Sequence, residues 1–240
     1  GLAGINITKT AMSNVSFDSS NYNKFARFLV DNGVFLTEDG GSTFRNLRIP
    51  RYLSAQSTIG GAICPNSNTI ITAVGDWVTR KIAITRNADV TNPTWDLLNG
   101  TEKNYTYYFF AFHPTNSNIA YADRYRFDNI QTDNTYGTLT KSVVAMYSGN
   151  GDIVYAYEVA VAGESSRIAK SIDKGDTWTT PYQNIPKLWT STDIGQIAID
   201  PNDQDKIYVA VRGAGIYTVT PSTITLKACP SSKFITIDSL

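Results

Sequence analysis

Carboxylates, arginines and aromatic side chains occur together in several short polar segments of this 240-residue chain. Two acidic side chains facing each other across a cleft could act as general acid and base on a glycosidic bond. An aromatic ring beside charged groups could instead bind a sugar, because the ring covers the C–H face while polar groups bond the hydroxyls. The carboxylates that these segments offer are Asp76, Asp123, Glu164 and Asp193. The arginines and aromatic residues beside them are Trp77, Arg124, Tyr125, Arg126, Trp189 and Arg212.

Other chemistries find little support in the residues. His113 is the single histidine, which excludes a metal site of several histidines and leaves a histidine-based triad unsupported. It stands at a hairpin turn, where a turn role is expected. The acidic run at 200–205 lacks the glycine and the distal glutamate of an EF-hand loop, so it is interpreted as a solvated turn. No glycine-rich phosphate loop is present. We therefore expect neither a metal nor a cofactor.

The composition narrows the classes of partner that this protein is expected to bind. Lys+Arg and Asp+Glu both number 21, and this zero net charge gives no support for a nucleic-acid partner. No apolar run approaches the roughly 18 residues that a membrane helix needs, so membrane insertion is not expected. Cys64 and Cys229 could pair or stay separate, and their positions do not decide between these states.

Two segments follow the pattern S/T-x-D-x-G-x-T-aromatic, at 37–44 and 171–178. In each, the aspartate can accept hydrogen bonds from backbone N–H groups of its own loop, and the glycine can adopt a positive φ. The aromatic residue is expected to pack inward. The pattern thus predicts a turn, and we interpret its residues as structural: Asp39, Gly41, Phe44, Asp173, Gly175 and Trp178.

A second repeat consists of an apolar strand, a turn rich in Pro, Asn and Asp, and another apolar strand. Its anchors are Asp18, Cys64, His113 and Asp200, and a further copy is expected near 148–152. The pattern of each copy is typical of a β-hairpin. Internal periods of roughly 35–50 residues are typical of propellers and solenoids.

The two repeats together predict five units of up to four strands, which is what propeller blades require. The fold class is therefore all-β, a propeller of about five blades in one domain over 1–240. The segments 1–10 and 230–240 could close the ring, or the chain could belong to a larger propeller. The second unit carries a stretched turn, 85–87 and 93–95, while the third has 137–142 at its third strand and no such turn. The expected blades span about 14–50, 60–98, 108–141, 143–182 and 194–226.

The segments 37–44 and 171–178 resemble the Asp-box (BNR) repeat of β-propellers, as found in sialidases, xyloglucanases, sortilin-type receptors, photosystem-assembly propellers and phage tail proteins. The resemblance implies that these turns lie on the side away from the usual ligand site. That site would be built by loops joining second to third strands and successive blades. The loops that join second to third strands would be 75–80, 123–128, 163–166 and 212–215. The loops that join successive blades would be 48–52, 99–108 and 181–193.

Within this face, 123–136 is expected to be the longest insertion, and long loops on rigid scaffolds tend to carry function. Alternatively, Trp77, Tyr125 and Trp189 simply cover the edge of the core. Arg48-Ile49-Pro50 is similar to a sialidase motif whose arginine contacts an acidic sugar, but it also stands where a blade ends. Xyloglucanase-type enzymes place a catalytic pair of Asp between two large propellers, whereas this chain holds at most one.

The resemblance leads to two hypotheses about function. The first is a non-catalytic binding or structural module of a secreted or virion-surface protein, which contacts glycan or protein through the loop face and may assemble with other chains. The alternative is a glycoside hydrolase of the xyloglucanase or sialidase type, or a fragment of one. The enzyme requires two carboxylates about 5–10 Å apart, or an arginine cluster for an acidic sugar.

Overall fold

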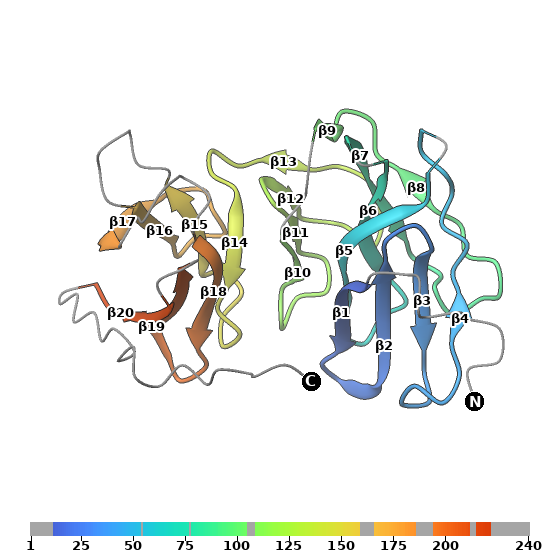
Figure 1. Cartoon of the computed structure of the whole chain (residues 1–240), viewed down its shortest axis with the longest axis horizontal. Coiled ribbons are helices and arrows are strands. Elements are labelled where there is room, and N and C mark those ends of the chain that lie inside the picture. Colours follow the sequence, from blue (N-terminus) through green and yellow to red (C-terminus); the bar gives the residue numbers. More distant parts are fainter. Residues whose placement is uncertain are drawn as a thin grey trace, which may run out of the picture. The chain divides into compact units, whose positions relative to one another are not determined.

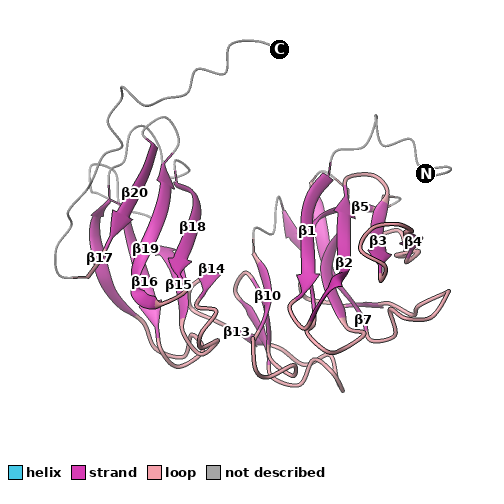
Figure 2. Cartoon of the chain, turned by 90° about the horizontal axis from the view of Figure 1, so that it is seen from below, coloured by secondary structure: helices cyan, strands magenta, loops and turns pink. Residues whose placement is uncertain are grey.

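The computed structural model describes residues 12–53, 55–76, 78–104, 109–158, 166–185, 194–211 and 215–221. These residues form antiparallel sheets joined by turns, and none of them lies in a helix (Figures 1 and 2). The all-β prediction is confirmed. The chain divides into two compact units, 1–139 and 140–240, and each is described separately.

The first unit contains three sheets whose strands follow one another in chain order (Figure 1). The first sheet consists of β1 (Met12–Asp18), β2 (Asn21–Leu29), β3 (Gly33–Thr37) and β4 (Arg45–Asn46). The second consists of β5 (Ser57–Ile63), β6 (Ile70–Gly75), β7 (Thr79–Thr85) and β8 (Asp96–Leu97), and β9 (Lys103–Asn104) also pairs with β7. The third consists of β10 (Phe110–Phe112), β11 (Ala120–Ala122), β12 (Tyr125–Phe127) and β13 (Gly137–Thr138).

The second unit contains two sheets with the same sequential order. One consists of β14 (Val143–Met146), β15 (Val154–Glu158), β16 (Ser166–Ser171) and β17 (Thr179–Ile185), and the other of β18 (Ile194–Asp200), β19 (Asp203–Val211) and β20 (Gly215–Val219). One apolar cluster fills this unit, with Tyr155, Ile168 and Tyr182 from the first sheet and Ile207 and Val209 from the second.

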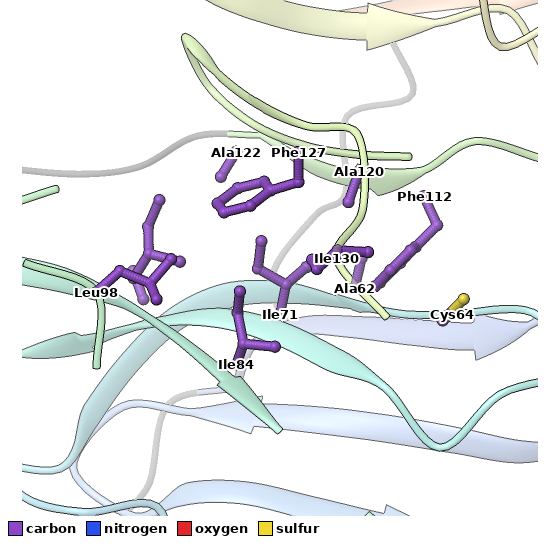
Figure 3. Close-up of a cluster of buried hydrophobic side chains, with 12 residues drawn as sticks. Ala62, Cys64, Ile71, Ile84, Leu98, Phe112, Ala120, Ala122, Phe127 and Ile130 are labelled. Carbon is purple, nitrogen blue, oxygen red and sulfur yellow. The ribbon is translucent and has the colours of Figure 1, made fainter. Parts of the chain in front are cut away.

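The sheets pack through alternating apolar side chains, as the twofold period of a strand requires. In the second sheet, Ile71 and Ile84 form a cluster with Phe112 and Phe127 of the third sheet (Figure 3). The alternate residues of the same strands face the first sheet, where they pack with side chains such as Phe28 and Leu36. The second sheet is thus buried on both faces, which explains why apolar residues occupy successive positions at 70–71 and 82–84.

The predicted hairpins are confirmed at all five anchors. Asp18, Cys64, His113 and Asp200 each stand at the turn between the first two strands of a sheet, and 148–152 lies between β14 and β15. The His113 Nδ1 atom accepts from the backbone N–H groups of Thr115 and Asn116, at 3.3 and 3.2 Å. Histidine therefore serves as a turn acceptor, the role that its position predicted.

Both Asp-box segments form the predicted turn between a third and a fourth strand. Asp173 Oδ1 accepts from the backbone N–H of Thr177 at 2.8 Å, and its Oδ2 accepts from the Thr177 hydroxyl at 2.6 Å. Asp39 makes the same two bonds with Thr43, at 2.9 and 2.7 Å. Gly175 has φ 91°, in the region that favours glycine. Two separate segments thus close through one hydrogen-bond pattern.

The stretched turn of the second sheet has the same chemistry with an amide. Asn87 Oδ1 accepts from the backbone N–H of Thr94 at 3.0 Å and from the Thr85 hydroxyl at 3.0 Å. The amide oxygen thus replaces the carboxylate across a longer loop, as the residues at 85–87 and 93–95 predicted.

A backbone bond is shared by four sheets. The residue after the Asp-box position donates its N–H to a carbonyl at the turn between the first two strands of its own sheet or, in the first sheet, at the start of the second strand. The bonds run from Gly40 to Asn23, Ala88 to Asn68, Ile130 to Asn118 and Lys174 to Asp152, at 3.0, 2.9, 3.0 and 2.8 Å. By this criterion the third sheet also has an Asp-box position, at Asn129, where the sequence predicted none.

The third sheet corrects two further predictions. The third strand is β12, Tyr125–Phe127, which was expected to belong to a loop, while part of the segment expected there forms the fourth strand, β13. The insertion therefore occupies 128–136, between the third and fourth strands, where the other sheets have their Asp-box turns. It does not join second to third strands, so it does not extend the predicted ligand face.

Some predictions fall outside the described residues. These are the ends 1–10 and 230–240 and the state of Cys229, while Cys64 is a buried free cysteine. A single propeller over 1–240 stays a prediction.

Candidate functional site

The predicted face can be followed in the first unit, where Asp76 and the segment Asp123–Arg126 are described. Asp76 lies at the β6–β7 turn, and Asp123 and Arg124 form the β11–β12 turn. Both turns join second to third strands, as the ligand face requires. The remaining candidates lie outside the described residues: Trp77, Glu164, Trp189, Asp193 and Arg212.

Asp76 is occupied by its own turn. Its Oδ1 atom accepts from the backbone N–H groups of Val78 and Thr79, at 2.8 and 2.6 Å. These bonds hold the pKa of Asp76 below its ordinary value, and the bond from Thr79 has the larger effect. A general acid needs a carboxyl that stays protonated near the working pH. Asp76 has the opposite property and is suited to holding the turn.

Asp123 is buried and ion-paired. It is 2% exposed, and its side chain pairs with the Lys103 ammonium group. Its Oδ1 atom accepts from the backbone N–H of Phe109 at 3.3 Å, and its own N–H donates to the Phe109 carbonyl at 3.0 Å. Its φ of 53° is the left-handed conformation that aspartate tolerates in tight turns. These contacts join β9, the start of the third sheet and the β11–β12 turn.

The other three described candidates have separate surroundings. Arg124 is exposed, and Arg126 pairs through Nε with Asp128 Oδ1 at 3.1 Å. Tyr125 packs against the core and meets the Tyr136 ring edge to face, with centroids 5.2 Å apart. Burial raises the pKa of Tyr125. These contacts favour the view that Tyr125 covers the core edge.

The strand register shows a polar row that the sequence analysis did not single out. Ser57 on β5 pairs with Gly75 on β6, Gly75 pairs with Arg80 on β7, and Arg80 pairs with Lys103 on β9. Paired residues of antiparallel strands point to the same face of a sheet. Ile82 follows Arg80 at a spacing of two and faces the third sheet. We call Ser57, Gly75, Arg80 and Lys103 the Arg80 row.

Two side chains of the Arg80 row are buried without satisfying their polar atoms. Arg80 is 2% exposed and Ser57 is 1% exposed. Within the described part of the chain, Arg80 Nε and Ser57 Oγ have no hydrogen-bond partner. Burial lowers the pKa of Arg80, and the negative charge of Asp76 partly offsets this effect. Buried polar groups are nearly always paired in folded proteins, so these two atoms require an explanation.

The charge of the next residue, Lys81, is fully compensated. It points to the opposite face of β7, where its Nζ atom lies 2.8 Å from Glu102 Oε1 and 2.8 Å from Asn99 Oδ1. The same ammonium group lies 5.1 Å from the centre of the Tyr52 ring. Hydrogen bonding to Lys81 lowers the pKa of Glu102. The two adjacent cations therefore differ: one has three partners and the other has an orphaned Nε.

A signal for the Arg80 row exists in the sequence, although only in part. Arg80 and Lys81 stand directly before the apolar run 82–84, and a charge in a buried strand suggests a function. Ser57 and Lys103 become its neighbours only through strand pairing, which an isolated sequence does not specify.

The sialidase-like triplet is a strand end in this structure. Arg48 is exposed, has φ 48° and lies two residues after the end of β4, while Ile49 is buried between the first two sheets. The backbone N–H of Arg48 donates to Asn46 Oδ1 at 2.7 Å. The arrangement favours a turn role for Arg48.

The described residues contain no group of three or more His, Cys, Asp or Glu side chains that could hold a metal ion. Among the same residues, no helix is long and apolar enough to cross a membrane.

Solved structures similar to this chain include several propeller proteins. The GH74 enzyme of Niastella koreensis has a TM-score of 0.64 and 17% identity, over 90% of this chain and 38% of that chain. The GH74 xyloglucanase of Xanthomonas campestris has a TM-score of 0.56 and 13% identity, over 85% and 36%. YCF48 of Cyanidioschyzon merolae has a TM-score of 0.53 and 15% identity, over 90% and 68%.

At these identities the likeness shows the fold alone, which is that of propeller blades. The chain spans 38% and 36% of the two GH74 chains. No family model and no curated protein matches the sequence.

Proposed function

We propose that this chain is a non-catalytic binding module that contacts a partner through the face formed by the β6–β7 and β11–β12 turns. The observation that carries the proposal is the state of the two described carboxylates on this face. Asp76 is bonded to its own turn, and Asp123 is buried in an ion pair with Lys103. The lowered pKa of Asp76 makes it unsuited to protonating a glycosidic oxygen, and Asp123 is engaged by the Lys103 ammonium group. The arrangement supports binding rather than hydrolysis.

A glycoside hydrolase is the second candidate, and the likeness to GH74 enzymes favours it. Such an enzyme would need two carboxylates about 5–10 Å apart on the loop face. Two of the predicted carboxylates, Glu164 and Asp193, lie outside the described residues. A hydrolase built on this chain would therefore have to rely on them, because Asp76 and Asp123 already serve the fold.

For the partner, we favour a protein over a glycan. One similar structure is described as YCF48 bound to a D1 peptide, with a TM-score of 0.54 and 13% identity over 89% of this chain. It shows that a propeller of related shape can hold a peptide. The described ring on this face, Tyr125, packs on the core rather than offering a platform for a sugar. We further propose, from the Asp-box resemblance, a secreted or virion-surface location and assembly with other chains.

Three measurements on the purified chain test these proposals. We expect binding on a peptide array, and no hydrolysis in a panel of fluorogenic glycosides. Binding confined to a glycan array would keep the module and replace its partner. Turnover of any glycoside, abolished by Glu164→Gln or Asp193→Asn, would overturn the binding proposal in favour of the hydrolase. Binding to neither array would also count against it.

A further inference from the structure

Arg80 is a buried cation with an unsatisfied hydrogen-bond donor. Removing a guanidinium group from water costs several kcal/mol unless hydrogen bonds and an opposite charge compensate for it. Arg80 Nε has no partner among the described residues. Asp76 is the acidic group that acts on it, but Asp76 Oδ1 is engaged by Val78 and Thr79.

The neighbouring charges are already compensated. Lys103, which pairs with Arg80 across the strands, is neutralised by Asp123. On the other face of β7, Lys81 is neutralised by Glu102. Each of these two cations is matched by a carboxylate, and Asp76 offsets part of the effect of burial on Arg80. What stays unsatisfied in the Arg80 row is hydrogen bonding, at Arg80 Nε and Ser57 Oγ.

The spacing of the strands sets the separation of these two unsatisfied groups. Neighbouring strands lie about 4.8 Å apart, so the backbones of Ser57 and Arg80 are separated by about 9.5 Å. Only Gly75, which has no side chain, stands between them. A Cβ atom on Gly75 would lie 2.2 Å from the Thr79 carbonyl oxygen and 3.1 Å from Arg80 Cγ. The glycine therefore allows β7 to approach closely and holds the stem of Arg80 over β6.

We propose that Ser57 and Arg80 form a binding site for the carboxylate of an acidic peptide. Arginine binds carboxylates through two parallel N–H groups, and an orphaned Nε is one member of such a pair. The Ser57 hydroxyl, which is also unpartnered, can donate to the same carboxylate. The proposal rests on the proposed binding function in its protein-partner form.

Burial favours a peptide as the source of this carboxylate. Ser57 and Arg80 are 1% and 2% exposed, so only a small group on a slender stem could reach them. A glutamate or aspartate side chain, or a chain terminus, has that form. The carboxylate of an acidic sugar is attached directly to a bulky ring, which this burial excludes.

Acetate provides the first test, because it is a free carboxylate. The melting temperature of the full chain is measured at pH 7 and constant ionic strength in acetate and in chloride. We expect about 0.1 M acetate to raise it by roughly 2–4 °C over chloride. Arg80→Met should weaken acetate binding at least about tenfold, and Ser57→Ala by roughly three- to tenfold. Lys174→Gln, which also removes one positive charge but at an Asp-box turn, should respond as the wild type does.

A structural role for Arg80 predicts a different result. If Arg80 only supports the fold, Arg80→Met melts earlier and keeps its response to acetate. Under the proposal, Arg80→Met melts at the same temperature or later in chloride, because it removes a buried donor that has no partner, and it loses the response. Circular dichroism verifies that the variant is folded. If it is not, Ser57→Ala decides: an unchanged response to acetate overturns the proposal.

Peptides provide the second test and separate the two proposals. An array of decapeptides carries glutamate at one position, and a matched array carries glutamine there. We expect preference for glutamate, lost in Arg80→Met, and no binding to uronic-acid oligosaccharides. Equal binding to both arrays would overturn the carboxylate site and leave the binding function standing. An acetate response without binding to peptide or glycan would support the site as a carboxylate receptor and overturn the proposed function.

Discussion

At the scale of single residues, the acidic side chains of this chain mostly serve turns. Asp39 and Asp173 accept bonds within their Asp-box turns, and Asp76 does so at the β6–β7 turn. In Asp173, bonds from the Thr177 hydroxyl and N–H lower the pKa to about 2. A carboxylate held in this way is ionised across the physiological range. It contributes to folding rather than to acid catalysis.

The low pKa of Asp173 predicts a pH dependence of stability. The folded value, about 2, lies below the ordinary 3.8, so the ionised group stabilises the fold above about pH 4. That contribution is lost as the pH falls from about 4 towards 2. We expect Asp173→Asn to lower the melting temperature at pH 7, with the gap to the wild type narrowing between pH 4 and 2. Differential scanning calorimetry across this range measures it.

The exposed Asp89 supplies the control for this prediction. Asp89→Asn should leave the melting temperature close to that of the wild type at every pH, since no turn of this kind depends on it. A gap between Asp173→Asn and the wild type that stays constant from pH 7 to 2.5 would contradict an electrostatic role for Asp173.

At the scale of elements, the residue after the Asp-box position has both its backbone N–H and its backbone carbonyl hydrogen-bonded in two sheets. Ala88 and Ile130 each donate their N–H to the hairpin turn of their own sheet. Their carbonyls accept from an arginine of the preceding sheet: Arg45 Nη2 bonds Ala88 at 2.6 Å, and Arg86 Nε bonds Ile130 at 2.6 Å. Each arginine thus connects its sheet to the Asp-box turn of the next.

Arg86 should control the order of the 128–136 insertion. Its guanidinium also donates to Asn134 Oδ1 at 2.8 Å and to the Asp133 carbonyl. We expect Arg86→Ala to destabilise the first unit by about 1–3 kcal/mol and to increase hydrogen exchange across the insertion. Hydrogen-exchange mass spectrometry locates the effect. Arg86→Lys should restore little, because lysine lacks the fork, and full protection in either variant would contradict this role.

The sequence predicted the elements where side chains alone define them. The anchors Asp18, Cys64, His113 and Asp200 stand at hairpins because their turn chemistry is local. Strand β12 was missed because its three residues, Tyr125–Phe127, lie between charged neighbours and resemble a loop. Pairing with β11 and β13 makes it a strand, and such context outweighs intrinsic propensity.

The candidate site was predictable to a similar extent. The β6–β7 turn around Asp76 lies where the repeat placed it, because the hairpin order of a blade is readable from apolar runs. The Arg80 row was not predictable. It depends on the register of four strands, and a shift of one residue would send Arg80 to the opposite face.

At the scale of the whole molecule, the chain consists of two units with separate apolar cores. The first unit has two clusters, one on each face of its second sheet, and the second unit has one cluster between its two sheets. Each sheet contributes strands that are adjacent in sequence, so most pairings are local. Local pairing favours units that can open independently.

A matched pair of core substitutions tests this independence. Val209 and Val74 are both fully buried, the first in the core of the second unit and the second in that of the first. We expect Val209→Ala to cost about 2 kcal/mol and to increase hydrogen exchange in β14–β20 alone. Val74→Ala should increase exchange in β1–β13 instead. Loss of protection throughout the chain in both variants would show a single cooperative unit.

The backbone bond shared by four sheets has a consequence for how such a chain diverges after internal duplication. Because the N–H and carbonyl groups belong to the main chain, the bond survives when the neighbouring side chain changes from Asp to Asn. A sheet can therefore lack the recognisable motif and keep this bond, as the second and third sheets do. Counting motifs then underestimates the number of duplicated units, whereas counting this bond finds twice as many.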